Sequence, residues 1–220
     1  MKANLTELVF ILDRSGSMAG LESDTIGGFN AMLEKQQAES GDCKITTVLF
    51  DNDYEVLHDR IEIKAVSPMT EKQYYVRGST ALLDAVGKTI NKIGNAQKNT
   101  TKEYRAEKVV FVITTDGMEN ASREFSYDKI RTMIENQKEK YNWEFIFLGA
   151  NIDAVRTASS IGICKSRAQN FHNDSAGIGV MYDIVGETLS AYRSAPRNSR
   201  IEDNWGENIE KDFEERKKKV

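Results

Sequence analysis

The chain has 220 residues, of which 40% are hydrophobic and 29% are charged. This is enough for one α/β domain with a fully buried sheet and too little for two. The formal net charge is −4, with basic and acidic residues mixed along most of the chain, which argues against nonspecific nucleic-acid binding. No apolar run approaches the roughly 20 residues of a membrane helix, so we expect neither a membrane span nor a membrane partner.

The N-terminal region and the cysteines indicate a location. The first apolar run, Leu8–Leu12, has five residues and is too short for the core of a secretion signal. Cys43 and Cys164 lie in no metal-ligand spacing, so we expect buried free thiols, which suit a reducing compartment. Together these features predict a cytoplasmic protein.

Apolar runs separated by amphipathic segments predict alternating strands and helices in chain order. Expected strands are residues 5–12, 43–50, 54–57, 108–114, 143–148 and 168–171. Expected helices are residues 26–38, 80–97, 127–140, 152–161 and 175–193. The turn residues Asp51-Asn-Asp53 predict an antiparallel hairpin, and residues 61–78 are expected to be irregular.

This alternation indicates an α/β fold with a doubly wound, mostly parallel sheet, one antiparallel edge strand and helices on both faces. We expect residues 1–193 to form the domain and residues 194–220 to form a charged, helical C-terminal tail. Four apolar side chains repeat every four residues in this tail, so it could either dock on the domain or bind a partner, and docking is favoured; they are Ile201, Trp205, Ile209 and Phe213.

Oxygen-bearing side chains follow the first strand at alternate positions. They are Asp13, Ser15 and Ser17, and Gly16 allows a sharp turn between the serines. Carboxylates and hydroxyls are hard ligands that suit Mg²⁺, Mn²⁺ or Ca²⁺, whereas Zn²⁺ usually binds His or Cys. The alternative is purely structural: the serines cap the next helix and Asp13 closes a side-chain turn.

Two later segments favour the metal site. Asp116 follows the strand at 108–114 and precedes a glycine, and Thr80 lies where a loop meets a helix. Ligands gather at the carboxyl ends of strands in such sheets, so these side chains are expected to meet Asp13.

The joint pattern of DRSGS at 13–17, GSTALLDA at 78–85 and TTDG at 114–117 resembles the von Willebrand factor A domain. The phrases FNAMLEKQ, TTDGMENAS and WEFIFLGANIDA are similar to small standalone bacterial or phage members. The resemblance implies a Rossmann-like fold and a metal-ion-dependent adhesion site. Its ligands would be Asp13, Ser15, Ser17, Thr80 and Asp116.

The implied function is metal-dependent protein binding without catalysis. A bound Mg²⁺, or Mn²⁺ or Ca²⁺ in its place, would coordinate an Asp or Glu of an unidentified protein partner. Five neighbouring residues are expected to rim the site and contact the partner; they are Arg14, Met18, Arg77, Glu119 and Asn120.

Two other functions stay open. A Mg²⁺-dependent hydrolase or phosphatase would use Asp13 as nucleophile, but the second acid typical of such enzymes is replaced by Ser15 and no catalytic lysine can be placed. A scaffold would assemble through its tail or edge strand and leave the metal site unused.

Overall fold

A computed structural model describes residues 5–218. Its sheet has six strands in the order β3-β2-β1-β4-β5-β6, and only the edge strand β3 is antiparallel to its neighbour. The strands are β1 (Thr6–Asp13), β2 (Cys43–Phe50), β3 (Tyr54–Glu62), β4 (Lys108–Thr115), β5 (Glu144–Gly149) and β6 (Ala168–Asn170). This confirms the predicted doubly wound sheet with one antiparallel edge strand.

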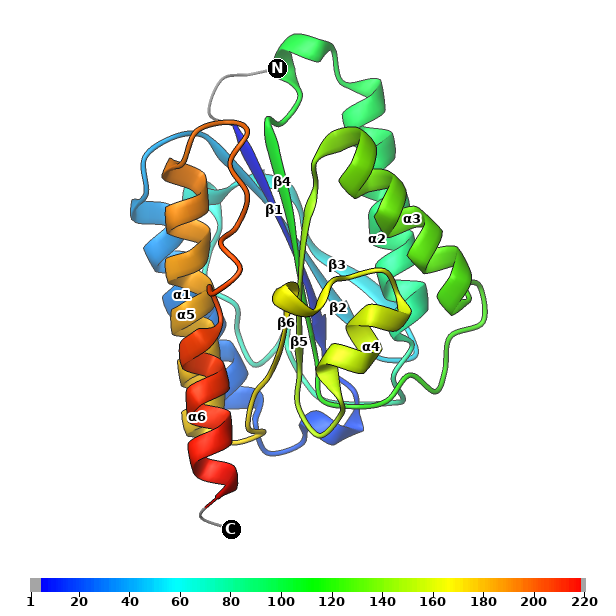
Figure 1. The fold of residues 1–220 in the computed structure, drawn as a ribbon, viewed down its shortest axis with the longest axis vertical. Coiled ribbons are helices and arrows are strands. Elements are labelled where there is room, and N and C mark those ends of the chain that lie inside the picture. The colour runs from blue at the N-terminus through cyan, green and yellow to red at the C-terminus, as the bar shows by residue number, and fades with distance from the viewer. Residues whose placement is uncertain (1–4, 219–220) are drawn as a thin grey trace.

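Helices cover both faces of the sheet. The α-helices are α1 (Glu22–Ala38), α2 (Leu82–Asn99), α3 (Tyr127–Tyr141), α4 (Ala154–Ser160), α5 (Ser175–Ser194) and α6 (Glu207–Lys217). Helices α1, α5 and α6 lie on one side and α2, α3 and α4 on the other, as Figure 1 shows. Among the described residues, no helix combines the length and apolarity needed to cross a membrane.

The central strands are apolar on both faces because both faces are covered. In β1, Leu8 and Phe10 belong to the core under α1 and α5, while Val9 and Ile11 belong to the core under α2 and α3. The near-continuous apolar run is therefore typical of a central parallel strand. Packing on both faces positions the end of β1.

Two elements differ from the sequence prediction. Strand β3 continues to Glu62 instead of ending at residue 57, because its polar residues lie on an exposed edge where an apolar pattern is not required. Helix α1 begins at Glu22 instead of residue 26, with Glu22 and Asp24 in a first turn that favours acidic side chains. Cys43 is buried as expected, but Cys164 is exposed in the turn before β6.

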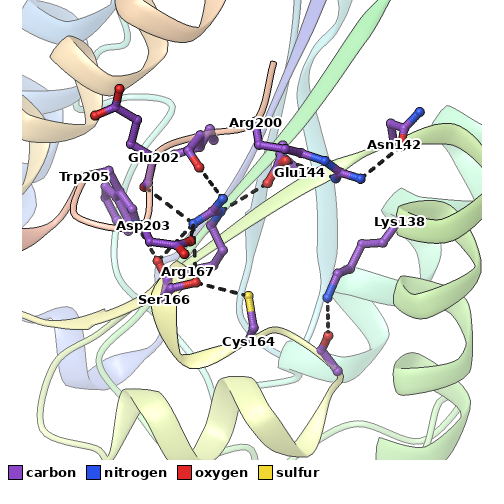
Figure 2. A network of polar contacts seen from close by, with 12 residues as sticks. Lys138, Asn142, Glu144, Cys164, Ser166, Arg167, Arg200, Glu202, Asp203 and Trp205 are labelled. Carbon is purple, nitrogen blue, oxygen red and sulfur yellow. Dashed lines mark hydrogen bonds and ion pairs between the residues drawn. The ribbon is translucent and has the colours of Figure 1, made fainter. Parts of the chain in front are cut away.

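The segment after α5 packs on the domain. Arg167 donates to Glu144 at 3.1 Å and to Asp203 at 2.8 Å, as Figure 2 shows. It also donates to the carbonyl of Ile201. The Trp205 indole donates to the Ser166 carbonyl at 2.8 Å. These contacts tie the connection before α6 to β5 and β6.

Helix α6 is held by apolar and polar contacts. Ile209 is 1% exposed in the core under α5. Phe213 stacks on His172 with ring centroids 4.7 Å apart, and its carbonyl is hydrogen bonded to the His172 ring at 3.0 Å. Arg216 also pairs with Asp174, the N-cap of α5. The helix therefore contacts the loop that leads from β6 to α5.

Candidate metal centre

The loop after β1 is fixed by its own polar groups. The Asp13 carboxylate accepts hydrogen bonds from the Ser15 backbone N–H at 2.7 Å and from the Thr115 hydroxyl at 2.7 Å. The Tyr74 hydroxyl donates to the Asp13 carbonyl at 2.6 Å. Asp13 thus closes the side-chain turn of the structural alternative. The hydroxyl of Ser15, however, does not cap the short helix η1 (Gly16–Met18) that it precedes.

Five oxygen-bearing side chains from three segments form one cluster. The Thr80 hydroxyl donates to the Ser15 hydroxyl at 3.0 Å, and the Ser15 and Ser17 hydroxyls are 3.1 Å apart. Ser17 in turn donates to the Asp116 carboxylate. Strand β1 pairs in parallel with β4, which places Asp13 and Asp116 at the same end of neighbouring strands. All five predicted ligands therefore meet where the winding of the sheet reverses.

Gly117 lies directly beside the hydroxyls of the cluster. A Cβ at Gly117 would lie 3.0 Å from the Thr80 hydroxyl oxygen and 3.1 Å from that of Ser17. A methyl group would thus fill the position that these two oxygens face. The cluster therefore has the hard oxygen donors that a small divalent cation requires, and the absence of a side chain at residue 117 leaves two of them uncrowded.

The charge of the cluster is uncompensated. Asp13 is 2% exposed and Asp116 is 1% exposed, and no basic side chain of residues 5–218 pairs with either. Burial raises the pKa of Asp13 against the hydrogen bonds from Ser15 and Thr115. Burial and the charge of Asp13 likewise raise the pKa of Asp116. Two buried carboxylates without a counterion favour a cation between them.

Arg14 and Met18 were expected on the rim, and the structure places both inside. Arg14 is 0% exposed; it donates to Asp51 at 2.9 Å and pairs with Glu55 at 2.7 Å. Met18 is 6% exposed and packs under the loop. Neither side chain can contact a partner. The rim prediction for Arg14 was wrong because Asp51, which the sequence suggested only as a turn residue, is buried and accepts a hydrogen bond from Arg14.

The other three rim candidates lie near the surface but have structural partners. Arg77 is exposed and donates to Asp51 at 2.8 Å. Glu119 accepts one hydrogen bond from the Leu83 N–H in the first turn of α2 and three from Ala121 and Ser122 of its own loop, so its carboxylate is fully engaged. Asn120 accepts from the Thr80 backbone N–H at 2.9 Å and donates its own N–H to the Thr80 carbonyl at 3.0 Å. Asn120 therefore holds Thr80 in position, while Glu119 ties its own loop to the first turn of α2.

Three residues at the site were not among the predicted site residues. Thr115 orients Asp13, and the Asn173 amide donates to Asp116 at 3.0 Å from the loop before α5. Met118 is 77% exposed directly after the site glycine. Thr115 could have been found from its position beside Asp116. Asn173 could not, because 57 residues separate it from the ligand it contacts.

Among residues 5–218, no group of three or more His, Cys, Asp or Glu side chains could hold a metal ion. The cluster described above is different in kind, because three of its five donors are hydroxyls. This donor set suits Mg²⁺, Mn²⁺ or Ca²⁺ better than it suits Zn²⁺.

Comparison with known proteins identifies the fold. No protein-family model and no curated protein matches the sequence. Solved structures do match at low sequence identity, and several of them are von Willebrand factor A domains. The domain from Catenulispora acidiphila has a TM-score of 0.58 at 13% identity, over 84% of this chain and 42% of that one. The fold is therefore that of the von Willebrand factor A domain.

Two further neighbours were solved with metal. Proximal thread matrix protein 1 from the mussel byssus, with a zinc-occupied adhesion motif, has a TM-score of 0.56 at 13% identity, over 84% of this chain and 46% of that one. The manganese-loaded TRAP protein of Plasmodium vivax has a TM-score of 0.57 at 19% identity, over 81% of this chain and 72% of that one. This chain thus spans less than half the length of the mussel and Catenulispora chains.

Proposed function

We propose that this protein is a metal-dependent protein-binding module and not an enzyme. Its ligands for the cation would be Asp13, Ser15, Ser17, Thr80 and Asp116. The observation that carries the proposal is the meeting of three hydroxyls and two unpaired buried carboxylates around the space beside Gly117.

Mg²⁺ is the proposed ion, with Mn²⁺ or Ca²⁺ as alternatives, because all the donors are hard oxygens. The zinc and manganese bound by the mussel and Plasmodium proteins support a divalent cation at such a motif. When bound, the cation supplies a coordination position for an anionic oxygen of the partner. The partner group is an Asp or Glu side chain of another protein.

The protein side chains have separate roles in this proposal. Ser17 is exposed and marks the accessible side of the cluster, with the exposed Met118 beside it as an apolar contact for the partner. Asp13 and Thr115 lie beneath and hold the loop in shape through the hydrogen bonds that Asp13 accepts from Thr115 and from the Ser15 backbone. Each Asp13 oxygen keeps acceptor capacity for the cation.

The phosphatase alternative is disfavoured by the position of Asp13. Both of its carboxylate oxygens accept hydrogen bonds, and the residue is 2% exposed. A nucleophile must reach its substrate, and an acid in this position cannot.

The proposal extends to a cytoplasmic protein of bacterial or phage origin, which is supported by the phrases that resemble such members. Expression of the tagged chain in a bacterial host followed by fractionation tests the location. Recovery in the periplasm or medium contradicts it.

The experiment has a direct and an indirect arm. Titration calorimetry measures Mg²⁺ and Mn²⁺ binding to the wild type, to Asp13→Ala and to Asp128→Asn, a control that removes an exposed carboxylate from α3. We expect binding to the wild type and the control only. Partner capture is then compared in Mg²⁺ and in EDTA.

The same partners captured in EDTA and by Asp13→Ala would contradict metal bridging. They would favour the scaffold that leaves its site unused. Phosphate release from a phosphoester that stops in Asp13→Asn would instead favour the hydrolase.

A further inference from the structure

A second candidate site lies at the opposite end of the sheet. A cavity of about 850 Å³ is formed by the C-terminal ends of α2 and α3, the loop before β4 and the connection from α5 to α6. In Figure 1 these segments meet at the upper end of the molecule, whereas the loops of the metal cluster lie at the lower end. Strands of this length separate the two ends by roughly 25 Å.

The charge of the cavity contrasts with that of the protein. Its lining includes six basic side chains and one carboxylate, that of Glu107, although the whole chain has a net charge of −4. The basic residues are Lys98, Lys102, Lys140, Arg105, Arg197 and Arg200. Because clefts concentrate the field of charges of one sign, this cavity attracts anions on an otherwise acidic protein.

The three arginines and the three lysines differ in their contacts. Arg105 donates to the carbonyls of Thr100 at 2.8 Å and Lys98 at 3.1 Å, at the C-terminus of α2. Arg197 pairs with Glu107 at 3.4 Å, and Arg200 pairs with Glu144 at 3.1 Å. The arginines thus stabilise the walls.

The lysine ammonium groups have no protein partner among residues 5–218. Lys98 and Lys140 lie in the last turns of their helices, where the helix dipole alone favours a cation. At α2, however, Arg105 already binds terminal carbonyls, and Lys102 is in a loop segment beyond the helix. Helix stabilisation therefore does not account for three unpaired lysines around one cavity.

We propose that this cavity binds a small ligand with several phosphate groups. Lysine is a flexible point charge with three donors, so three lysines can meet phosphates spaced along one ligand. The volume falls in the range of small-molecule sites, about 300–1,000 Å³. Trp143 contributes to the lining, and the ring of Tyr141, 60% exposed, offers a face for stacking. The ligand is either an inorganic polyphosphate or a nucleotide.

Calorimetry in EDTA tests this proposal apart from any metal-dependent binding. The probes are inorganic tripolyphosphate and ATP. The test variant is Lys98→Gln, Lys102→Gln and Lys140→Gln combined. The control removes three exposed lysines elsewhere; its changes are Lys64→Gln, Lys72→Gln and Lys165→Gln.

We expect one tripolyphosphate to bind per chain, with affinity about tenfold or more weaker in the test variant and unchanged in the control, because charge-assisted contacts to phosphate are lost. Higher salt should weaken binding to the wild type. If ATP binds more tightly than tripolyphosphate and this difference is lost in Tyr141→Ala, the ligand is a nucleotide. If the two probes bind with equal affinity, the ligand is an inorganic polyphosphate.

A measurement on the unaltered chain avoids dependence on the variants. Lysine methylation followed by mass spectrometry should show Lys98, Lys102 and Lys140 protected by tripolyphosphate while Lys64 and Lys72 stay reactive. Absence of binding, equal losses in the test and control variants, or displacement by an oligoglutamate peptide of equal affinity would each overturn the proposal.

Discussion

Gly117 provides the sharpest test of the metal cluster. Its Gly117→Ala variant places one methyl group 3.0 Å from the Thr80 hydroxyl oxygen and 3.1 Å from that of Ser17. Ordinary contacts of a Cβ begin at 3.4 Å, so the hydroxyls must move by a few tenths of an ångström. Mg²⁺ requires near-octahedral geometry with metal–oxygen distances of about 2.0–2.1 Å, which leaves little tolerance for such shifts.

The expected loss of Mg²⁺ affinity is about 10- to 100-fold, the usual cost of disturbing the groups around a metal, or about 1.4–2.8 kcal/mol. Stability should change by less than about 1 kcal/mol. The residue is not in the left-handed region, so alanine restricts the unfolded chain at little cost to the backbone. A weaker Mg²⁺ affinity with an unchanged free energy of unfolding would show that the variant is folded and has lost only metal binding.

Gly27→Ala in α1 is the matched control, because nothing lies within 4 Å of its added Cβ. It should bind Mg²⁺ as the wild type does and gain up to about 1 kcal/mol of stability, since alanine favours a helix over glycine. Titration calorimetry and urea denaturation measure both quantities. Unchanged Mg²⁺ affinity in Gly117→Ala would refute the placement of the ion beside Gly117.

Three further changes test the surroundings of the cluster. Asn173→Ala removes the amide donor to Asp116 and should weaken Mn²⁺ binding severalfold with little loss of stability; a calorimetric affinity equal to that of the wild type contradicts this role. Arg14→Ala leaves a buried carboxylate without this partner, so urea denaturation should show a loss of about 3 kcal/mol; a loss below about 1 kcal/mol would rule out this buried pair as a main stabilising contact. Arg216→Gln tests pH dependence: the hydrogen bond from Arg216 lowers the pKa of Asp174 in the folded state, so the stability it adds is present above about pH 4 and is lost as the pH falls through the folded pKa. Urea midpoints of wild type and variant should therefore differ at neutral pH and converge in acid, and a difference that persists in acid contradicts the assignment.

The fold was largely predictable because the apolar pattern of most strands and helices matches the way they are buried. Strands β1 and β4 are covered on both faces, so their central residues form uninterrupted apolar runs that are easily recognised. Strand β3 was shortened in the prediction because an edge strand with one exposed face carries little apolar signal. Its full length is determined by hydrogen bonds to β2, from Tyr54 to Glu62, which are contacts between separate segments.

The five oxygen-bearing residues of the cluster were also predictable from the sequence, since each of them follows a strand or precedes a helix. The prediction failed at Arg14 and Met18, which it placed on the rim and which are buried. Whether a side chain beside a motif points outward depends on its partners, and the acceptor of Arg14 is 37 residues away. Local sequence contains no information on such a pair.

The sequence by itself determined the order of strands and helices and the oxygen donors at 13–17, 80 and 116, because apolar periodicity and ligand chemistry are local properties. Only the tertiary structure decided that Asn173 supports Asp116 and that Arg14 is buried against Asp51. It also brought Lys98, Lys102 and Lys140 to one cavity from two helices and a loop. These features depend on parallel pairing and helix packing, which join residues far apart in the chain.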